Sequence, residues 1–448
     1  MEKKIALSIA GSDPSGGAGI QADLKSFSFL VVHGLTVVTC VTSQNTKQVT
    51  QIFPLPVDII EKQIDTLYED TRPNAVKTGM LYDAEIIKCV AKKISQYSMK
   101  PVVDPIMVST SGDALSKNDY VSALKKELLP HAYVLTANIP ESCELLGKEI
   151  QSIEGMENAC KELRKLGPKY ILLKGGHLDT KQATDVFFDG KKMTNFSLPR
   201  ISKEKIHGTG CTFSALITGF FALGEEPIEA VRKSKYVLWG MINEGYKIGK
   251  GAEVPNHSIK TIPPITIENE HFSVWFELKN AIDNLLTILP EDYIAEVGMN
   301  FAYAVKNAKS LEDVCAVDGR IIKTKVGIKQ CGDLTFGASK HVASIVLAVM
   351  SFDSKIRCAL NLRYSQETLE CCKKAQLRIG PFDRKDEPKN AKSTMEWGTS
   401  HTIKKLGFVP DIIHDNGSIG KEPMIRVLGK DPKEVLYKIQ RLLDYRSK

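Results

Sequence analysis

The sequence predicts a protein of the α/β class with two domains, and three observations lead to this prediction. The chain has 448 residues, more than one ordinary hydrophobic core supports. Short apolar runs of strand length alternate with amphipathic segments of helical period, as in parallel sheets covered by helices. Around residues 256–272 the pattern stops at a Pro-Pro pair without a periodic apolar face, as in a linker. We therefore expect domains at 1–258 and 273–448, joined by a linker at 259–272.

The first domain is expected to alternate strands with helices from its start. Each strand run is rich in Val, Ile and Leu, which favours burial on both faces of a sheet. The expected strands are 4–11, 75–80, 100–108, 132–138 and 169–177, and the expected helices are 16–32, 83–97, 119–129 and 139–147.

The second domain restarts the pattern after the linker. Residues 274–289 are apolar at helical spacing, and strand-like runs follow at 356–364 and 411–417. These features predict a second, C-terminal α/β or α+β unit.

Composition narrows the class of protein. Hydrophobic residues make up 43% and charged residues 25% of the chain, as in globular proteins. No run of 18 apolar residues exists, and the N-terminal stretch resembles a first strand more than a signal peptide. The ten cysteines form no CxxC pair, so reduced thiols and a cytoplasmic location are expected. The net charge of +7 is spread without Arg-rich runs, which argues against nucleic-acid binding.

A glycine-rich turn follows the first expected strand. In AGSDPSGGAGIQADLKSF, Asp13 and several glycines precede a helix that carries Asp23. Glycine lets a ligand approach the backbone closely. Taken alone, the turn is equally compatible with a structural role.

Polar residues stand at the carboxyl ends of later strands, where open α/β sheets bind ligands. Asp104 ends the strand in VVDPIM. Asn138 and Glu141 follow the strand in LTANIPE and suit magnesium or its waters. Lys174 in LLKGGH is placed to reach a nucleotide phosphate. Each residue alone is also an ordinary turn, cap or solvated side chain.

The most specific motif is HGTGCTF, ahead of an apolar helix. Gly208, Thr209 and Gly210 leave backbone N–H groups free at the helix start, where the helix dipole adds positive potential. Such a nest suits the oxygens of a phosphoryl group in transfer. Cys211 stands at the same helix start, where the pKa of a thiol is expected to fall below its ordinary value.

In this order, the segments resemble the hydroxymethylpyrimidine/phosphomethylpyrimidine kinases of thiamine biosynthesis, which have the ribokinase-like layered fold. The resemblance covers residues 4 to about 255. It rests on AGSDPSGGAGIQADLK, QNT, KTGML, VVDPIM, SGDAL, LLKGGH and HGTGCTFSA. Ala137 departs from the family, where proline is common. The resemblance implies ATP and Mg²⁺, small-molecule substrates and a dimer through this domain.

The resemblance also implies roles for individual residues. Asp23 and Gln44 would hydrogen-bond the aminopyrimidine and its hydroxymethyl group, and Cys211 would be the candidate base. The ring pocket would be lined by Gly11, Ala18 and Met80. The nucleotide would be bound by Lys174, Asn138 and Thr209, and its metal by Asp104 and Glu141. The catalytic turn would consist of Gly208 and Gly210.

A thiol at this position needs an explanation, because many small-molecule kinases have an aspartate there as general base. An enzyme of this family phosphorylates first an alcohol and then the resulting phosphate monoester. The monoester is already an anionic nucleophile, which a carboxylate would repel and a neutral thiol would not. Phosphoryl transfer also depends more on positioning and electrostatics than on a base.

Several motifs of the C-terminal half favour anionic ligands. Arg320 precedes a strand-like run, and His341 lies at the start of an apolar helix that follows Ser339, a plausible N-cap. Asn361 and Arg363 lie at a strand end. A turn-rich loop follows with Asp411, Asp415 and Lys421. Each cluster is also compatible with an ordinary cap or turn.

As a set these motifs resemble the ThiN-type thiamine-phosphate synthase domain. The match covers about residues 275–448, through EVGMNFAYA, GRI, FGASKHVA, NLRYS, FDR and PDIIHDNGSIGKEPMI. The resemblance implies condensation of the pyrimidine diphosphate with a thiazole phosphate and release of pyrophosphate. The implied catalytic residues are Arg320 and His341. Lys421, Asn361 and Arg363 would bind substrate, with Asp411 or Asp415 near a metal.

Two alternatives stay open at this point. ThiN-like domains also occur as ligand sensors on transcription regulators, so the second domain would then bind thiamine phosphate and govern the kinase. The sequence shows no helix-turn-helix segment that such a regulator would carry. A pyridoxal-kinase-like activity is the second alternative, although Gln44 and Met80 favour the pyrimidine.

Overall fold

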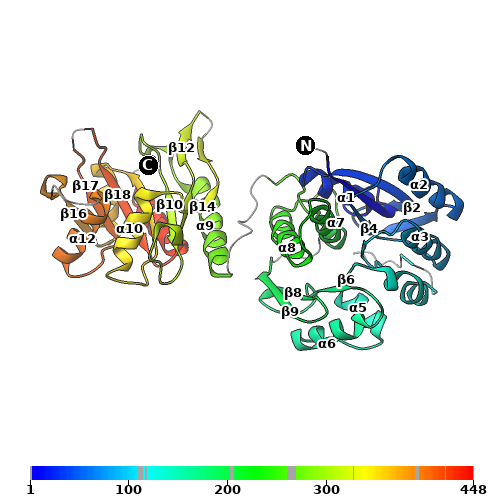
Figure 1. Ribbon diagram of the computed structural model, residues 1–448. Coiled ribbons are helices and arrows are strands. Elements are labelled where there is room, and N and C mark those ends of the chain that lie inside the picture. Colours follow the sequence, from blue (N-terminus) through cyan, green and yellow to red (C-terminus); the bar gives the residue numbers. More distant parts are fainter. Residues whose placement is uncertain are drawn as a thin grey trace. The chain divides into compact units, whose positions relative to one another are not determined.

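The computed structural model describes residues 3–107, 115–116, 119–201, 206–259, 269–325, 327–388, 393–418 and 420–446. The chain divides into two compact units, Met1–Ile265 and Thr266–Lys448 (Figure 1). Of the predicted SGDAL motif, only Leu115 lies within the described residues.

The described part of the first unit contains a nine-stranded sheet in the order β3-β2-β1-β4-β5-β6-β7-β8-β9. The six central strands, β2 to β7 in this order, are parallel, while β3, β8 and β9 are antiparallel additions at the two edges. The strands are β1 (Ile5–Ser12), β2 (His33–Gln44), β3 (Val49–Pro54), β4 (Ala75–Thr78), β5 (Pro101–Val103), β6 (Val134–Asn138), β7 (Tyr170–Lys174), β8 (Gln182–Phe188) and β9 (Met193–Pro199).

Helices cover both faces of this sheet. On one face, α7 and α8 lie side by side and bury Phe213, Leu216 and Val237 against the sheet (Figure 1). On the other, α2, α3, α5 and α6 enclose the larger core cluster around Leu7 and Ile9. The helices are α1 (Gly19–Phe29), α2 (Val57–Asp70), α3 (Ala84–Gln96), α4 (Tyr120–Ala123), α5 (Ile139–Leu146), α6 (Ile153–Arg164), α7 (Thr209–Ala222) and α8 (Pro227–Asn243), with short helical turns at Leu124–Leu128 and Leu129–His131. This layered arrangement confirms the predicted α/β class.

The described part of the second unit contains a seven-stranded sheet in the order β14-β11-β10-β15-β18-β17-β16, with a separate β12–β13 hairpin. Its pairs are antiparallel except for β16 with β17. The strands are β10 (Phe301–Ala304), β11 (Val314–Val317), β12 (Arg320–Thr324), β13 (Gly327–Cys331), β14 (Leu334–Phe336), β15 (Cys358–Arg363), β16 (Ile379–Phe382), β17 (Ile412–Asp415) and β18 (Met424–Gly429).

Helices also pack against this second sheet. Helices α10 and α12 contact each other and pack onto the sheet through Val342, Val346 and Ile403, while α9, α11 and α13 form a separate group. The helices are α9 (Asn269–Ile288), α10 (Lys340–Met350), α11 (Gln366–Lys374), α12 (Thr394–Leu406) and α13 (Pro432–Leu443), with 3-10 turns at Glu291–Tyr293, Leu311–Asp313 and Arg384–Asp386.

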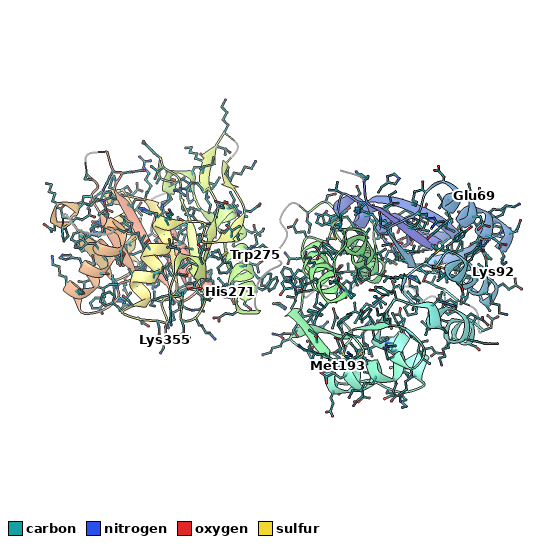
Figure 2. All side chains as sticks on the ribbon, viewed as in Figure 1. Glu69, Lys92, Met193, His271, Trp275 and Lys355 are labelled. Carbon is teal, nitrogen blue, oxygen red and sulfur yellow. The ribbon has the colours of Figure 1, made fainter. Side chains whose placement is uncertain are left out.

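Helix α9 begins earlier than the sequence pattern indicates. Its first residue, Asn269, falls inside the stretch expected to be linker. Phe272 is buried, and its ring lies 6.2 Å from that of Trp275 and 6.3 Å from that of Phe276. Figure 2 shows Trp275 on this helix. Aromatic packing therefore extends the helix toward its N-terminus. Within the described ranges, no helix has the length and apolar character needed to cross a membrane.

Candidate active sites

The first unit contains a cavity of about 510 Å³ at the carboxyl ends of its parallel strands. The structure brings to this cavity every residue predicted for the first domain, although they come from seven separate segments. These residues are Gly11, Ala18, Asp23, Gln44, Met80, Asp104, Asn138, Glu141, Lys174, Gly208, Thr209, Gly210 and Cys211. Parallel strands converge at one edge of a sheet, which explains the gathering.

The glycine-rich turn is organised by Asp13, a residue to which the sequence assigned no contact. Its carboxylate accepts hydrogen bonds from the backbone N–H groups of Ser15, at 2.9 Å, and Ala18, at 2.8 Å. His207 Nε2 lies 2.9 Å from the same carboxylate and 3.1 Å from Gln44 Nε2. Burial acts to raise the pKa of Asp13, but hydrogen bonds from His207, Ser15 and Ala18 hold it below its ordinary value. The turn thereby fixes Gln44 at the cavity wall.

Asp23 lies in a fully buried ion pair at the base of the cavity. Lys77 Nζ is 2.7 Å from Asp23 Oδ1, and Ser8 donates to Asp23 Oδ2 at 2.6 Å. Neither charged side chain is exposed to solvent. Burial acts to lower the pKa of Lys77, but the attraction of Asp23 more than compensates and keeps the ammonium protonated. Lys77 is a cavity residue that the sequence reasoning missed, although it stands in the quoted KTGML motif.

A second charged group lies where a nucleotide phosphate is expected. Lys174 Nζ is 2.8 Å from Asp104 Oδ1 and 3.9 Å from Glu141 Oε2. Glu141 also forms a capping box with Asn138 at the start of α5, with bonds of 2.7 and 2.8 Å. Burial raises the pKa of Glu141 to about 7. Two carboxylates thus share one ammonium beside the start of α7.

Helix α7 begins at Thr209, with Gly208 as its N-cap, in the turn where the sequence predicts an anion nest. Gly208 has φ +85°, and a Cβ at this position would lie 1.7 Å from the backbone oxygen of Gly17. Only glycine therefore allows the two turns to meet. A Cβ at Gly210 would lie 3.5 Å from Lys174 Nζ, so Gly210 borders the charged group.

Cys211 corrects one expectation from the sequence. Its side chain is only 8% exposed, and burial raises the pKa of its thiol to about 12 instead of lowering it. The neighbouring carboxylates of Asp23 and Asp104 act in the same direction, whereas Lys77 opposes them. Desolvation outweighs the helix dipole here, so the thiol is neutral at physiological pH.

The second unit contains a cavity of about 440 Å³. Four residues predicted for this domain line it: Arg320, His341, Asn361 and Lys421. Asn361 is buried and accepts a hydrogen bond from the backbone N–H of Asn300 at 2.7 Å. Desolvation of the imidazole and the charges of Arg426, Arg384 and Arg320 lower the pKa of His341. His341 is therefore neutral, and the cations around it dominate the electrostatics of the cavity.

Three predicted residues are not part of this cavity lining. Arg363 is exposed at the end of β15. Asp411 lies just before β17, where Arg378 and Lys438 bind its carboxylate at 3.1 and 2.8 Å. Asp415 lies at the other end of β17, and both of its carboxylate oxygens accept from arginines. We therefore withdraw the expectation of a metal at Asp411 or Asp415, because cations of the chain already occupy both carboxylates.

Arg384 also lines this cavity, although the sequence analysis gave it no role. It stands in the quoted FDR motif. Among the described residues, no group of three or more His, Cys, Asp or Glu side chains is arranged to hold a metal ion.

Comparisons with known proteins agree with the two units. The family model for phosphomethylpyrimidine kinase matches residues 13–256, and the model for thiamine-phosphate synthase ThiN matches residues 277–441. The bifunctional thiamine biosynthesis protein ThiDN of Methanocaldococcus jannaschii is 35% identical over 444 residues, which cover 97% of each chain. The hydroxymethylpyrimidine/phosphomethylpyrimidine kinase of Bacillus subtilis is 41% identical over 254 residues, covering 56% of this chain and 94% of its own.

A solved structure matches the first unit. The pyridoxal kinase of Bacillus subtilis in complex with ADP is 35% identical and superimposes with a TM-score of 0.54. The match covers 57% of this chain and 98% of that kinase.

Proposed function

Because the chain belongs to the family of bifunctional ThiDN proteins of thiamine biosynthesis, we propose that each of its two cavities carries one of the two activities. The chain is a hydroxymethylpyrimidine and phosphomethylpyrimidine kinase fused to a thiamine-phosphate synthase. The assignment of the kinase to the first cavity rests on one observation. All thirteen residues that the sequence predicts for a pyrimidine and nucleotide site line this single space.

The pyrimidine binds between the glycine-rich turn and β2 in this proposal. Gln44, fixed through His207 and Asp13, hydrogen-bonds the aminopyrimidine edge. Asp23 faces the hydroxymethyl group, and its pairing with Lys77 keeps it in one orientation. Gly11 lines the ring pocket, and only a glycine packs this closely against β2, since a Cβ there would lie 2.6 Å from Cys40 Sγ.

The phosphoryl group is transferred at the start of α7. The backbone N–H groups after Gly208 and the ammonium of Lys174 stabilise the charge that spreads over the transferred oxygens. ATP is the proposed donor. The neutral thiol of Cys211 does not repel a phosphate monoester, so the same cavity accepts the alcohol and then its phosphate.

Mg²⁺ is the metal proposed to accompany ATP. Asp104 and Glu141 supply the oxygen donors that this ion prefers. Lys174 Nζ already lies 2.8 Å from Asp104 Oδ1, so Asp104 would bind the ion only once this ammonium turns toward a nucleotide phosphate. The ion would neutralise charge on the phosphates. Asn138 keeps Glu141 in place through the capping box and leaves its second oxygen, Oε1, available.

The synthase reaction is assigned to the second cavity. The thiazole nitrogen forms a bond to the pyrimidine methylene carbon as the bond from this carbon to the diphosphate oxygen breaks. The bonding electrons leave with pyrophosphate, and the step needs no proton transfer. The cations Arg320 and Lys421 stabilise the negative charge on the leaving group, and neutral His341 donates or accepts a hydrogen bond beside it. Asn361, held by Asn300, is proposed to contact the substrate.

A second candidate activity of the first cavity is phosphorylation of pyridoxal. It is favoured by the similarity to the pyridoxal kinase of Bacillus subtilis. A direct comparison of the two alcohols as substrates, at equal ATP concentration, decides between them. A kcat/KM for pyridoxal above that for the pyrimidine would contradict the proposed preference.

The proposal includes a dimer formed through the first unit and a cytoplasmic location. Val41 and Phe53 pair across β2 and β3 near the sheet edge and are 47% and 60% exposed, which suits a partner subunit. A Phe53→Lys variant that sediments as the wild-type oligomer would contradict this interface. The proposed location rests on the ten cysteines, which form no CxxC pair in the sequence and are all free in the structure.

Separate cavities for the two reactions are tested by a bypass experiment. A Lys174→Met chain is expected to make no pyrimidine diphosphate from the pyrimidine and ATP. When given the diphosphate and thiazole phosphate, it is expected to form thiamine phosphate at the wild-type rate. Lys181→Met, which removes an exposed lysine, is the matched control. Loss of both reactions in a folded Lys174→Met chain would contradict the assignment.

A further inference from the structure

Behind the second cavity lies a buried cluster of charges with two arginines and one carboxylate. Arg384 Nε donates to Asp415 Oδ1 at 2.6 Å, and Arg426 Nη2 donates to Asp415 Oδ2 at 2.6 Å. The side chains of Arg384, Asp415 and Arg426 are 7%, 0% and 1% exposed. One buried carboxylate therefore faces two guanidinium groups, and the cluster retains a net positive charge.

Arg426 is held firmly but incompletely. Its guanidinium carbon lies 5.3 Å from the ring centre of Phe382, and Nη1 donates to the backbone oxygen of Met424 at 3.2 Å. Its Nε is buried and has no hydrogen-bond partner among the described residues. Burying a charged group without all of its hydrogen-bond partners costs free energy. Such a group therefore suggests a role in the neighbouring site.

Arg384 connects this cluster to the cavity. Its Nη2 donates to Asp415 Oδ2 and to the backbone oxygen of Glu422, both at 3.2 Å. Its Nη1 has no acceptor among the described residues, and Arg384 lines the cavity. All three of these contacts lead to Asp415 or to the backbone just before β18, so the guanidinium has little freedom to turn away.

The cavity around Arg384 has an excess of positive charge. Arg320, Arg384 and Lys421 line it, against the single carboxylate of Glu422. Both oxygens of that carboxylate already accept hydrogen bonds, from the backbone N–H groups of Glu296 and Val297. This excess of positive charge favours an anionic ligand. A guanidinium presented edge-on suits the oxygens of a phosphate or diphosphate group.

We propose that Arg384 binds the diphosphate group in the second cavity, and that Asp415, backed by Arg426, is a positioning residue that holds the guanidinium of Arg384 toward the ligand. This inference rests on the proposed synthase site. It adds Arg384 as a ligand-binding residue, with Asp415 and Arg426 as the groups that orient it. It also gives Asp415 a role other than metal binding. A diphosphate carries more charge than a phosphate monoester, so the cluster favours the diphosphate of the pyrimidine over the phosphate of the thiazole.

Calorimetric titration of the full-length chain with inorganic pyrophosphate tests the proposal. Saturating AMP-PCP, without added metal, occupies the first cavity. Arg384→Met is expected to weaken pyrophosphate binding by about 10- to 100-fold, the usual effect of losing a charge-assisted contact. Arg384→Lys keeps the charge but loses the fork of donors and is expected to recover the affinity only in part. Unchanged pyrophosphate affinity in Arg384→Met would overturn the proposal.

A double-mutant cycle separates positioning by Asp415 from a general structural effect. Asp415→Asn is expected to weaken pyrophosphate binding in the wild-type chain and to have no further effect in the Arg384→Met chain. Full additivity of the two effects would overturn the positioning role. The matched controls are Arg378→Met and Asp411→Asn, which break the Arg–Asp pair before β17 in the same domain. They are expected to leave the affinity within about twofold.

A fallback comparison and a second ligand complete the test. If Asp415→Asn does not fold, as judged by circular dichroism, the comparison of Arg384→Met with Arg384→Lys decides alone. Titration with inorganic phosphate distinguishes the two anionic groups: a loss for phosphate without a loss for pyrophosphate in Arg384→Met would overturn the diphosphate assignment. Arginine-dependent pyrophosphate binding in a chain that forms no thiamine phosphate would support the binding role while refuting the synthase function.

Discussion

Replacing Gly208 by alanine tests whether the start of α7 is the phosphoryl-transfer site. Gly208 has φ +85°, a conformation that costs an L-residue about 1 to 2 kcal/mol. The added Cβ would lie 1.7 Å from the backbone oxygen of Gly17, whereas real contacts of this kind stay above 3.0 Å. The two turns must therefore separate by at least 1.3 Å, the difference between these distances.

A shift of this size moves the N–H groups of the nest away from the phosphoryl oxygens. Displacement of about 1 Å in an active site costs about 100-fold in rate, which is the loss expected for Gly208→Ala. The assay is release of ADP during phosphorylation of hydroxymethylpyrimidine by the full-length chain. Gly208→Ala is also expected to bind the pyrimidine more weakly, because Gly17 and its neighbours line the turn beside it.

Gly224→Ala is the matched control for backbone strain. Gly224 follows α7 and has φ +92°, but a Cβ there meets nothing within 4 Å. It is expected to lose about 1 to 2 kcal/mol of stability and less than about twofold in rate. A folded Gly208→Ala chain with more than a third of the wild-type rate would refute the reasoning about the nest.

Three other substitutions have defined outcomes. Lys77→Met leaves Asp23 buried without its partner and is expected to lower the free energy of unfolding by about 3 to 5 kcal/mol, measured with urea; a loss below about 1 kcal/mol would contradict the buried ion pair. Burial acts to raise the pKa of Asp411, but hydrogen bonds from Arg378 and Lys438 hold it at about 2, below its ordinary value of 3.8. The ionised carboxylate therefore stabilises the fold at pH values above this range. Asp411→Asn is thus expected to cost about 2 kcal/mol at pH 7, with the deficit shrinking as the pH falls from about 4.5 to 2; a deficit independent of pH would argue against the linkage. Cys211→Ala is expected to slow phosphorylation of the alcohol and of the monophosphate to a similar extent, measured by separate assays, because a thiol with a pKa of about 12 is protonated at physiological pH; a larger loss with the alcohol would show that Cys211 acts as a base.

The first cavity could largely be predicted from the sequence because its residues sit in local motifs. Each motif follows a strand of a parallel sheet, and the carboxyl ends of such strands must meet at one edge. Lys77 was not predicted as a cavity residue, because its role depends on the ion pair with Asp23, which is 54 residues away in the chain. The pairing becomes evident only when β4 lies beside β1 and α1 packs on β1.

The pKa of Cys211 shows where local reasoning stops. A helix start lowers the pKa of a thiol, and the sequence places Cys211 at such a start. Burial depends on the packing of segments distant in the sequence, and here it outweighs the local effect. The sequence contains the first effect but not the second.

The second cavity was less predictable because its sheet is mostly antiparallel. Neighbouring strands of such a sheet run in opposite directions, so functional residues do not all follow the same strand ends. Asp411 directly precedes β17 and Asp415 is its last residue, so the two lie about 13 Å apart at strand rise. The strand-like run predicted at 411–417 already implied this separation. Arg426 reaches Asp415 only through the pairing of β17 with β18.

The most direct test of one chain with two activities is a single coupled reaction followed by mass spectrometry. The full-length chain receives hydroxymethylpyrimidine, ATP, Mg²⁺ and hydroxyethylthiazole phosphate. We expect the wild type to form thiamine phosphate, and Arg320→Ala to accumulate pyrimidine diphosphate without it. Pyrimidine diphosphate as the end product of the wild-type chain, with tight binding of thiamine phosphate to the second unit, would contradict the account and indicate a sensor domain.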